Sequence, residues 1–191
     1  MNMKRILIVY ATSHGHTRAI AEALATRLRS GRHIVELADA GANPVPPIGY
    51  NIVILGSRVE FGRHAPSIIG YIETHRALLQ ALPTAFFSVN NAAATAHDVD
   101  PLGYLERLFT TTKWRPRHAI AFVGALPYRE YGWMLRIVMK QIAKRAGTPT
   151  DTSHNHVLTQ WDSVDRFADE VADDFITQQR EPVQIHPARA M

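Results

Sequence analysis

The sequence predicts a doubly wound α/β fold, in which helices cover both faces of a five-stranded parallel sheet. Short runs rich in β-branched and aromatic residues recur along the 191 residues, and such runs are typical of buried strands. Segments with apolar residues at helical spacing separate these runs. Strands that alternate with helices form right-handed crossover units, and such units build a parallel sheet.

The first two elements set this pattern. Residues 4–10, KRILIVY, are apolar enough to form a strand that is buried on both faces. Residues 15–30 are expected to form a helix, because Ile20, Leu24 and Leu28 recur at every fourth position.

The later elements continue the alternation. Proline and glycine predict a loop at residues 41–47, and Pro66 suits the first turn of the second helix. Further strands are expected at residues 33–38, 51–57, 84–90, 118–126 and 154–161, and further helices at residues 66–79, 101–112 and 163–176.

One domain is expected at residues 1–178. Residues 127–151 break the α/β alternation and are interpreted as an insertion that interrupts the last strand. Residues 179–191 are expected to form a disordered tail, as chain termini often do.

Composition excludes several kinds of chemistry. The chain has no cysteine, which excludes a disulfide, a thiolate nucleophile and a cysteine-based metal site. No run of 18 apolar residues predicts a spanning helix, and no signal-peptide segment is apparent, which favours a cytoplasmic protein. The net charge of +4 favours an acidic partner such as an anionic membrane, a nucleic acid or a carboxylate. The alternative is a mildly basic surface that binds no partner.

The turn at residues 12–17, TSHGHT, is the first candidate site. It follows the first strand and precedes a helix, and ligands of such sheets bind at the carboxyl ends of the strands. Backbone N–H groups at a helix N-terminus attract a phosphate, three hydroxyls add donors, and Gly15 permits close approach. An ordinary N-cap turn is the alternative. The turn has neither the lysine of a P-loop nor a dinucleotide motif.

Two further loops are expected at the same edge of the sheet. Residues 56–64, GSRVEFGRH, follow the third strand, and residues 88–96, SVNNAAATA, follow the fourth. Together with residues 12–17 they are expected to surround one cleft.

The chain resembles two groups of proteins. The pattern Thr12-x-x-Gly15-x-Thr17 resembles the phosphate loop of flavodoxins, which bind FMN and have strand order 2-1-3-4-5. Four later motifs resemble the menaquinone-dependent protoporphyrinogen oxidases, flavodoxin-like enzymes of bacterial haem synthesis. These motifs are AFFSVN (85–90), WRP (114–116), GALPYREYGW (124–133), and TDT (150–152) followed by Trp161. The resemblance covers residues 5–174.

This resemblance implies a set of FMN-binding residues. The phosphate would be held by Thr12, Ser13, His14, Gly15, His16 and Thr17. One side of the flavin ring would be bordered by Arg58, Val59, Glu60, Phe61 and Gly62, and the other by Ser88, Val89, Asn90 and Asn91. Phe61 is the candidate to stack on the ring.

The implied reaction is the six-electron oxidation of protoporphyrinogen IX to protoporphyrin IX, with menaquinone or ubiquinone as the acceptor. The flavin carries the redox chemistry, so no catalytic side chain is expected. Arg58 or Arg63 would hold the propionates of the substrate, because arginine pairs with carboxylates through two hydrogen bonds. The alternative for each arginine is a solvated surface charge.

Residues 131–147 within the insertion are expected to form a basic helix with an apolar side. This pattern is typical of docking on an anionic membrane, where a quinone would be met. The residues expected to dock are Trp133, Arg136, Lys140, Lys144 and Arg145. Packing on the core and self-association of the chain are the alternatives. The expected location is therefore cytoplasmic, peripheral to the inner face of the cell membrane.

The sequence also allows other functions on the same fold. An electron-carrier flavodoxin and an NAD(P)H:quinone reductase share the fold, although the positive charge and the insertion count against a carrier. No nucleic-acid partner is expected, because no basic-aromatic recognition motif appears. No metal is expected, because His154 and His156 have no third ligand at suitable spacing. Trp114 and Trp161 are interpreted as anchors of the core or of the insertion.

Overall fold

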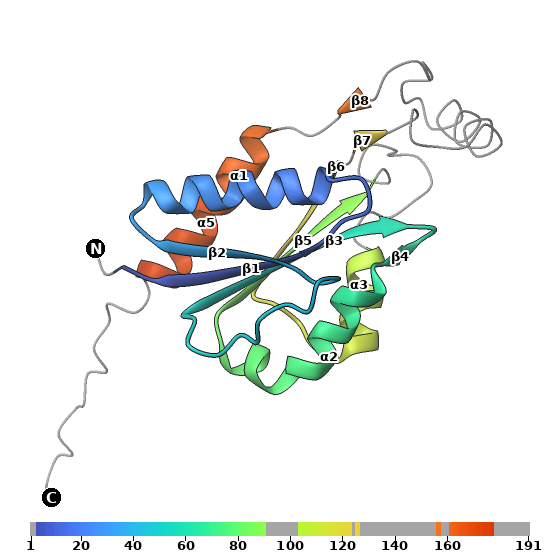
Figure 1. Ribbon diagram of the computed structural model, residues 1–191, viewed down its shortest axis with the longest axis horizontal. Coiled ribbons are helices and arrows are strands. Elements are labelled where there is room, and N and C mark those ends of the chain that lie inside the picture. The colour runs from blue at the N-terminus through green and yellow to red at the C-terminus, as the bar shows by residue number, and fades with distance from the viewer. Residues whose placement is uncertain (1–2, 91–102, 124, 127–155, 158–160, 178–191) are drawn as a thin grey trace, which may run out of the picture.

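The structure is a computed structural model that describes residues 3–90, 103–123, 125–126, 156–157 and 161–177. Its main sheet contains five parallel strands in the order β2-β1-β3-β5-β6 (Figure 1). The strands are β1 (Arg5–Ala11), β2 (Ile34–Asp39), β3 (Ile52–Glu60), β5 (Thr84–Asn90) and β6 (His118–Val123). Counted along the chain, this is the 2-1-3-4-5 order that the resemblance to flavodoxins implied.

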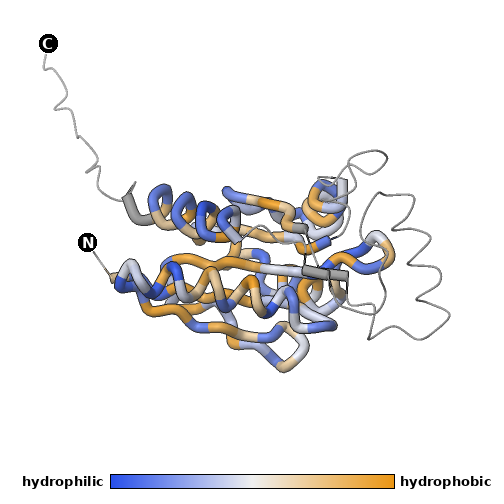
Figure 2. Tube along the Cα trace, turned by 90° about the horizontal axis from the view of Figure 1, so that it is seen from above, coloured by the Kyte–Doolittle hydropathy of each residue, from blue (hydrophilic) through white to orange (hydrophobic). Residues whose placement is uncertain are grey.

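Helices cover both faces of the sheet (Figure 1). The helices are α1 (His16–Ser30), α2 (Pro66–Ala81), α3 (Gly103–Thr112) and α5 (Trp161–Thr177). Side chains alternate along β1, so Ile6 and Ile8 pack against α1 and α5, whereas Leu7 and Val9 pack against α2 and α3. Figure 2 shows the hydrophobic strands between helices that carry polar residues on their outer sides.

Trp114 belongs to the second of these cores. Its side chain is 1% exposed and lies between Phe86 and Phe109, which confirms it as a core anchor. Trp161 is not a core residue, because it is 43% exposed at the start of α5. Its ring instead contacts the ring of His16 edge-on, with centroids 6.2 Å apart.

The segment after β3 is a hairpin, whereas the sequence predicted a loop from residue 56. β3 continues to Glu60 and pairs antiparallel with β4 (Arg63–His64). Phe61 and Gly62 form the two-residue turn, with φ of 49° and 73°. Positive φ at both central residues is the geometry that suits the twist of a tight hairpin. The hairpin therefore projects from the carboxyl end of the sheet, as Figure 1 shows at β4.

The end of the chain departs from the predicted boundaries. The strand expected at residues 154–161 is only β8 (His156–Val157), paired antiparallel with β7 (Ala125–Leu126). Trp161 is already helical, two residues before the predicted start of α5. The expected insertion at 127–151 and tail at 179–191 lie outside the described residues, so the expected domain limits stay predictions. Among the helices that the structure describes, none is long and apolar enough to cross a membrane.

Candidate functional site

The turn between β1 and α1 leaves the N-terminus of the helix open to a ligand. The N-cap is Gly15, with φ of 78° and no side-chain capping hydrogen bond, and the first turn contains no acidic residue. The hydroxyls of this turn therefore do not serve as the helix cap that the alternative reading required. A Cβ at residue 15 would meet nothing within 4 Å, so glycine is needed there for its backbone conformation.

Thr12 supplies an independent sign of a ligand. Its Oγ1 atom is buried and has no hydrogen-bond partner within the part of the chain that the structure describes. A buried hydroxyl without a partner is costly, and an anion in the turn would satisfy it. Thr17, in the first turn of α1, is also buried. The hydroxyls and open N–H groups thus fit a phosphate.

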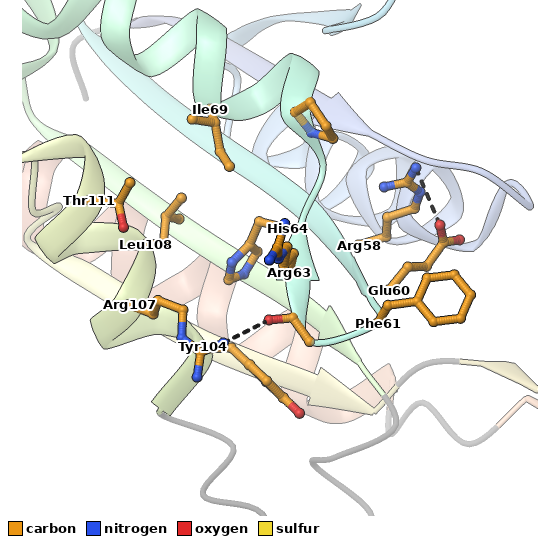
Figure 3. A pocket seen from close by; sticks show the side chains of 12 residues that line it. Arg58, Glu60, Phe61, Arg63, His64, Ile69, Tyr104, Arg107, Leu108 and Thr111 are labelled. Atoms are coloured by element: carbon orange, nitrogen blue, oxygen red, sulfur yellow. Dashed lines mark hydrogen bonds and ion pairs between the residues drawn. The ribbon is translucent and has the colours of Figure 1, made fainter.

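The hairpin is joined to this turn by polar contacts. Nε of Arg58 donates a short hydrogen bond to Oγ of Ser13. Glu60 forms an ion pair with Arg58, at 3.3 Å (Figure 3), and its Oε1 lies 3.9 Å from Nε2 of His14. Residues that follow two different strands, 45 positions apart at Ser13 and Arg58, therefore lie at one edge of the sheet, as predicted from the topology.

Phe61 lies at the tip of this hairpin. Its side chain is 88% exposed, and its left-handed backbone conformation is held by the tight turn. A flat ring that binds beside the hairpin would find this aromatic face available. The position agrees with the stacking role that the resemblance implies, which stays a prediction.

The end of β5 is buried more deeply than a ring-binding loop would be. Ser88 is inside the sheet, where its Oγ lies 3.0 Å from Nε2 of His64 and accepts a hydrogen bond of 3.1 Å from Nδ2 of Asn90. Val89 is also buried. Asn91 lies outside the described residues. Ser88 therefore connects the end of β5 with His64 of β4 inside the sheet.

His64 is a site residue that sequence reasoning missed. It is 5% exposed and packs edge-on against Phe86. Burial lowers the pKa of the imidazole from its ordinary value of 6.5 to about 4, because a low-dielectric surrounding disfavours the charged form. At neutral pH the site therefore contains an uncharged histidine.

This histidine should make the stability of the fold dependent on pH. The unfolded chain binds a proton at His64 below pH 6.5, and the folded chain does so only near pH 4. The free energy of unfolding should therefore fall by about 3 kcal/mol as pH falls through this window. Denaturant unfolding at pH 7 and pH 5 should show about 2 kcal/mol of this change, because at pH 5 the folded chain is still above its own pKa. The variant His64→Gln should lose this part of the pH dependence. The same change in the free energy of unfolding for both proteins would contradict the low pKa of His64.

A pocket of about 520 Å³ adjoins the hairpin, between β4, α2 and α3 (Figure 3), and its lining includes Arg58, Glu60 and Phe61. Residues from α3 line it at positions 104, 107, 108 and 111, which share one side of a helix. Arg63 is exposed there and has no carboxylate partner among the residues that the structure describes. Sequence reasoning did not connect α3 with the hairpin, although the helical spacing of these residues was visible.

The residues expected to dock on a membrane, from 133 to 145, lie outside the described residues, as do His154 and the rest of the expected insertion at 127–151. His156 is in β8. Their expected roles therefore stay predictions from the sequence.

Comparison with known proteins gives both a family and named relatives. A profile of the flavodoxin domain matches residues 7–153. A protein of Escherichia coli K12 named protoporphyrinogen IX dehydrogenase (quinone) is 31% identical over 171 residues, which cover 88% of this chain and 94% of that protein. A Leishmania major protein of the same name is 31% identical over 177 residues, covering 88% and 74%.

Solved structures show the same fold at lower identity. Oxidised flavodoxin 1 of Bacillus cereus aligns with a TM-score of 0.54 and 15% identity, over 88% of this chain and 97% of that one. The flavodoxin of Streptococcus pneumonia TIGR4 aligns with a TM-score of 0.54 and 14% identity, over 89% and 99%.

Proposed function

The chain belongs to the flavodoxin domain family, and from this premise we propose that it oxidises protoporphyrinogen IX to protoporphyrin IX with FMN and passes the electrons to a quinone. The observation that carries the proposal is the 31% identity, over 88% of the chain, to proteins named for this quinone-dependent reaction. Their named activity is that of an oxidoreductase, and this chain is an oxidoreductase of the same family.

FMN is the cofactor of the flavodoxin domain, and bound FMN supplies the two-electron redox chemistry. The turn at residues 12–17 would hold its phosphate through backbone N–H groups and the hydroxyls of Thr12 and Thr17. Phe61 would cover the ring and keep water from it. Nothing in this arrangement requires a nucleophilic side chain, which agrees with the lack of cysteine.

The substrate carries carboxylates, and arginines near the hairpin suit them. Of the two arginines expected from the sequence, Arg58 is engaged with Ser13 and Glu60. Arg63 lines the pocket of Figure 3 and is the stronger candidate for a propionate.

Delivery of electrons to a quinone implies contact with a membrane, because long-chain quinones dissolve there. The basic, aromatic pattern around residues 133–145 supports peripheral docking on the inner face of the cell membrane. This part of the proposal rests on the sequence, since the segment lies outside the described residues.

The proposed function predicts that protoporphyrinogen IX, mixed anaerobically with the FMN-loaded protein, bleaches the visible absorption band of the flavin. Adding a quinone should restore the band and produce porphyrin fluorescence. Because oxidation removes six electrons and each quinone accepts two, three quinones should be consumed per porphyrin. The control is NADPH in place of the porphyrinogen. Bleaching by NADPH, without bleaching by the porphyrinogen, would favour a nicotinamide-dependent quinone reductase instead.

A further inference from the structure

The pocket behind the hairpin, here called the hairpin pocket, combines a polar side and an apolar side. Its members come from the hairpin, from the start of α2 and from one side of α3 (Figure 3). The polar side is formed by Arg63 and Arg107 and the apolar side by Pro66, Ile69, Tyr104 and Leu108.

The hairpin pocket has an excess of positive charge. Three arginines and one glutamate line it, so three positive charges minus one negative leave two. Glu60 is paired with Arg58, and the burial-lowered pKa of His64, about 4, keeps that residue neutral. Within the part of the chain that the structure describes, Arg63 and Arg107 have no carboxylate partner.

Arg107 is held in place without being neutralised. Its Nη1 donates a hydrogen bond of 3.4 Å to the backbone carbonyl of Gly62 in the turn of the hairpin. An arginine side chain has five N–H donors, so most of its hydrogen-bonding capacity stays available to a ligand. The contact also keeps the guanidinium beside the hairpin, as the dashed line in Figure 3 shows.

The apolar side determines which anion suits the hairpin pocket. Leu108 is buried, Ile69 and Tyr104 are half-buried, and their side chains form a wall beside the arginines. A small hydrated anion gains nothing from such a wall. A molecule with an apolar body and short carboxylate arms gains from both sides, because its body is taken out of water while its arms pair with the arginines.

We propose that the hairpin pocket binds the carboxylate arms of the tetrapyrrole, with Arg63 and Arg107 as the paired recognition residues and Tyr104 and Leu108 against the edge of the macrocycle. The proposal rests on the proposed function and deepens it, since it assigns a substrate-recognition role to α3. Phe61 is the neighbour of Gly62 in the same turn. Arms bound in the pocket would therefore keep the macrocycle near the exposed ring of Phe61.

The test compares protoporphyrin IX with its dimethyl ester, in which both carboxylates are blocked. Binding to the FMN-loaded full chain is followed by the change in porphyrin fluorescence. The protein should bind the diacid more tightly than the ester. The variant Arg107→Met should lower affinity for the diacid about tenfold, because it removes a charge-assisted pair, and should leave affinity for the ester and for FMN unchanged. Arg63→Met should behave in the same way.

Arg76→Met is the matched control. Arg76 is also exposed and also donates one long hydrogen bond, 3.5 Å, to a backbone carbonyl, that of Thr112, but it does not line the pocket. This variant should bind the diacid as the natural sequence does. Arg107→Lys keeps the charge without the forked donor group, and it serves as the second variant if Arg107→Met does not fold.

Three results would overturn the inference. These are equal affinity of the natural protein for diacid and ester, equal effects of the variants at residues 107 and 76, and a loss of FMN affinity in Arg107→Met that matches its loss of diacid affinity. The last would show that the pocket belongs to the flavin site. If any of these results is found and the natural protein still oxidises protoporphyrinogen IX, only the pocket assignment is wrong. If the natural protein neither binds porphyrin nor oxidises the porphyrinogen, the proposed function itself is refuted.

Discussion

Replacing Gly56 by alanine should destabilise the fold by about 3 kcal/mol or more. Gly56 lies within β3, and a Cβ there would overlap the Cζ, Cε1 and Cε2 atoms of the Phe87 ring. Phe87 cannot move aside easily, because it is fully buried in the core that α1 and α5 cover. Interiors are packed as densely as crystals, so the overlap must be relieved by moving strands or changing side-chain rotamers.

Urea unfolding measured by circular dichroism checks this expectation. The control is Gly70→Ala in α2, where a Cβ would meet nothing within 4 Å. That change should stabilise the protein by about 0.5–1 kcal/mol, because alanine has the higher helix propensity. The double variant Gly56→Ala/Phe87→Leu should recover part of the lost stability. An unchanged unfolding midpoint for Gly56→Ala alone would show that β3 and β5 are not packed as described.

The double variant Gly15→Val/Thr17→Val should weaken FMN about a hundredfold or more. A branched residue at Gly15 must adopt φ near 78°, which costs about 1–2 kcal/mol. Valine in place of Thr17 removes a hydroxyl of the phosphate turn, and a hydrogen bond to a charged group contributes about 1.5–3 kcal/mol. Each 1.4 kcal/mol is about tenfold in affinity. Titration of the apoprotein with FMN, followed by quenching of flavin fluorescence, measures the change.

Thr12→Val separates binding from stability. The hydroxyl that it removes is buried without a partner in the described part of the chain, so the apoprotein should be at least as stable as before. FMN affinity should nevertheless fall about tenfold, because a donor to the phosphate is lost.

Unchanged FMN affinity in the double variant at residues 15 and 17 would rule this turn out as the phosphate site.

The order of the elements could be predicted from the sequence because burial imposes simple periodicities. Residues 84–90 are apolar enough to be buried on both faces, and the structure has β5 at those residues. The spacing of apolar residues likewise located α1 within one residue of its observed start. The strand order came with the family resemblance, because local patterns do not say which strands are neighbours.

The hairpin could not be predicted in the same way. Its turn is Phe61-Gly62, and a bulky aromatic with positive φ is not a usual turn signal. The contacts that stabilise it come from distant residues, Ser13 on one side and Arg107 on the other. The burial of His64 depends on Phe86 and Ser88 of the next strand. Such features follow from tertiary packing, which overrides local preference.

The β3–β4 hairpin connects the candidate phosphate turn with the hairpin pocket. Arg58 and Glu60 attach it to the turn at Ser13 and His14, and Gly62 attaches it to Arg107 beside the pocket. A ligand that orders the hairpin reduces the conformational entropy that the hairpin must still lose when a second ligand binds. Linkage then requires each ligand to raise the affinity of the other by the same factor. For a reaction that takes three rounds on one macrocycle, such reciprocity would keep the cofactor bound most firmly while a tetrapyrrole occupies the pocket.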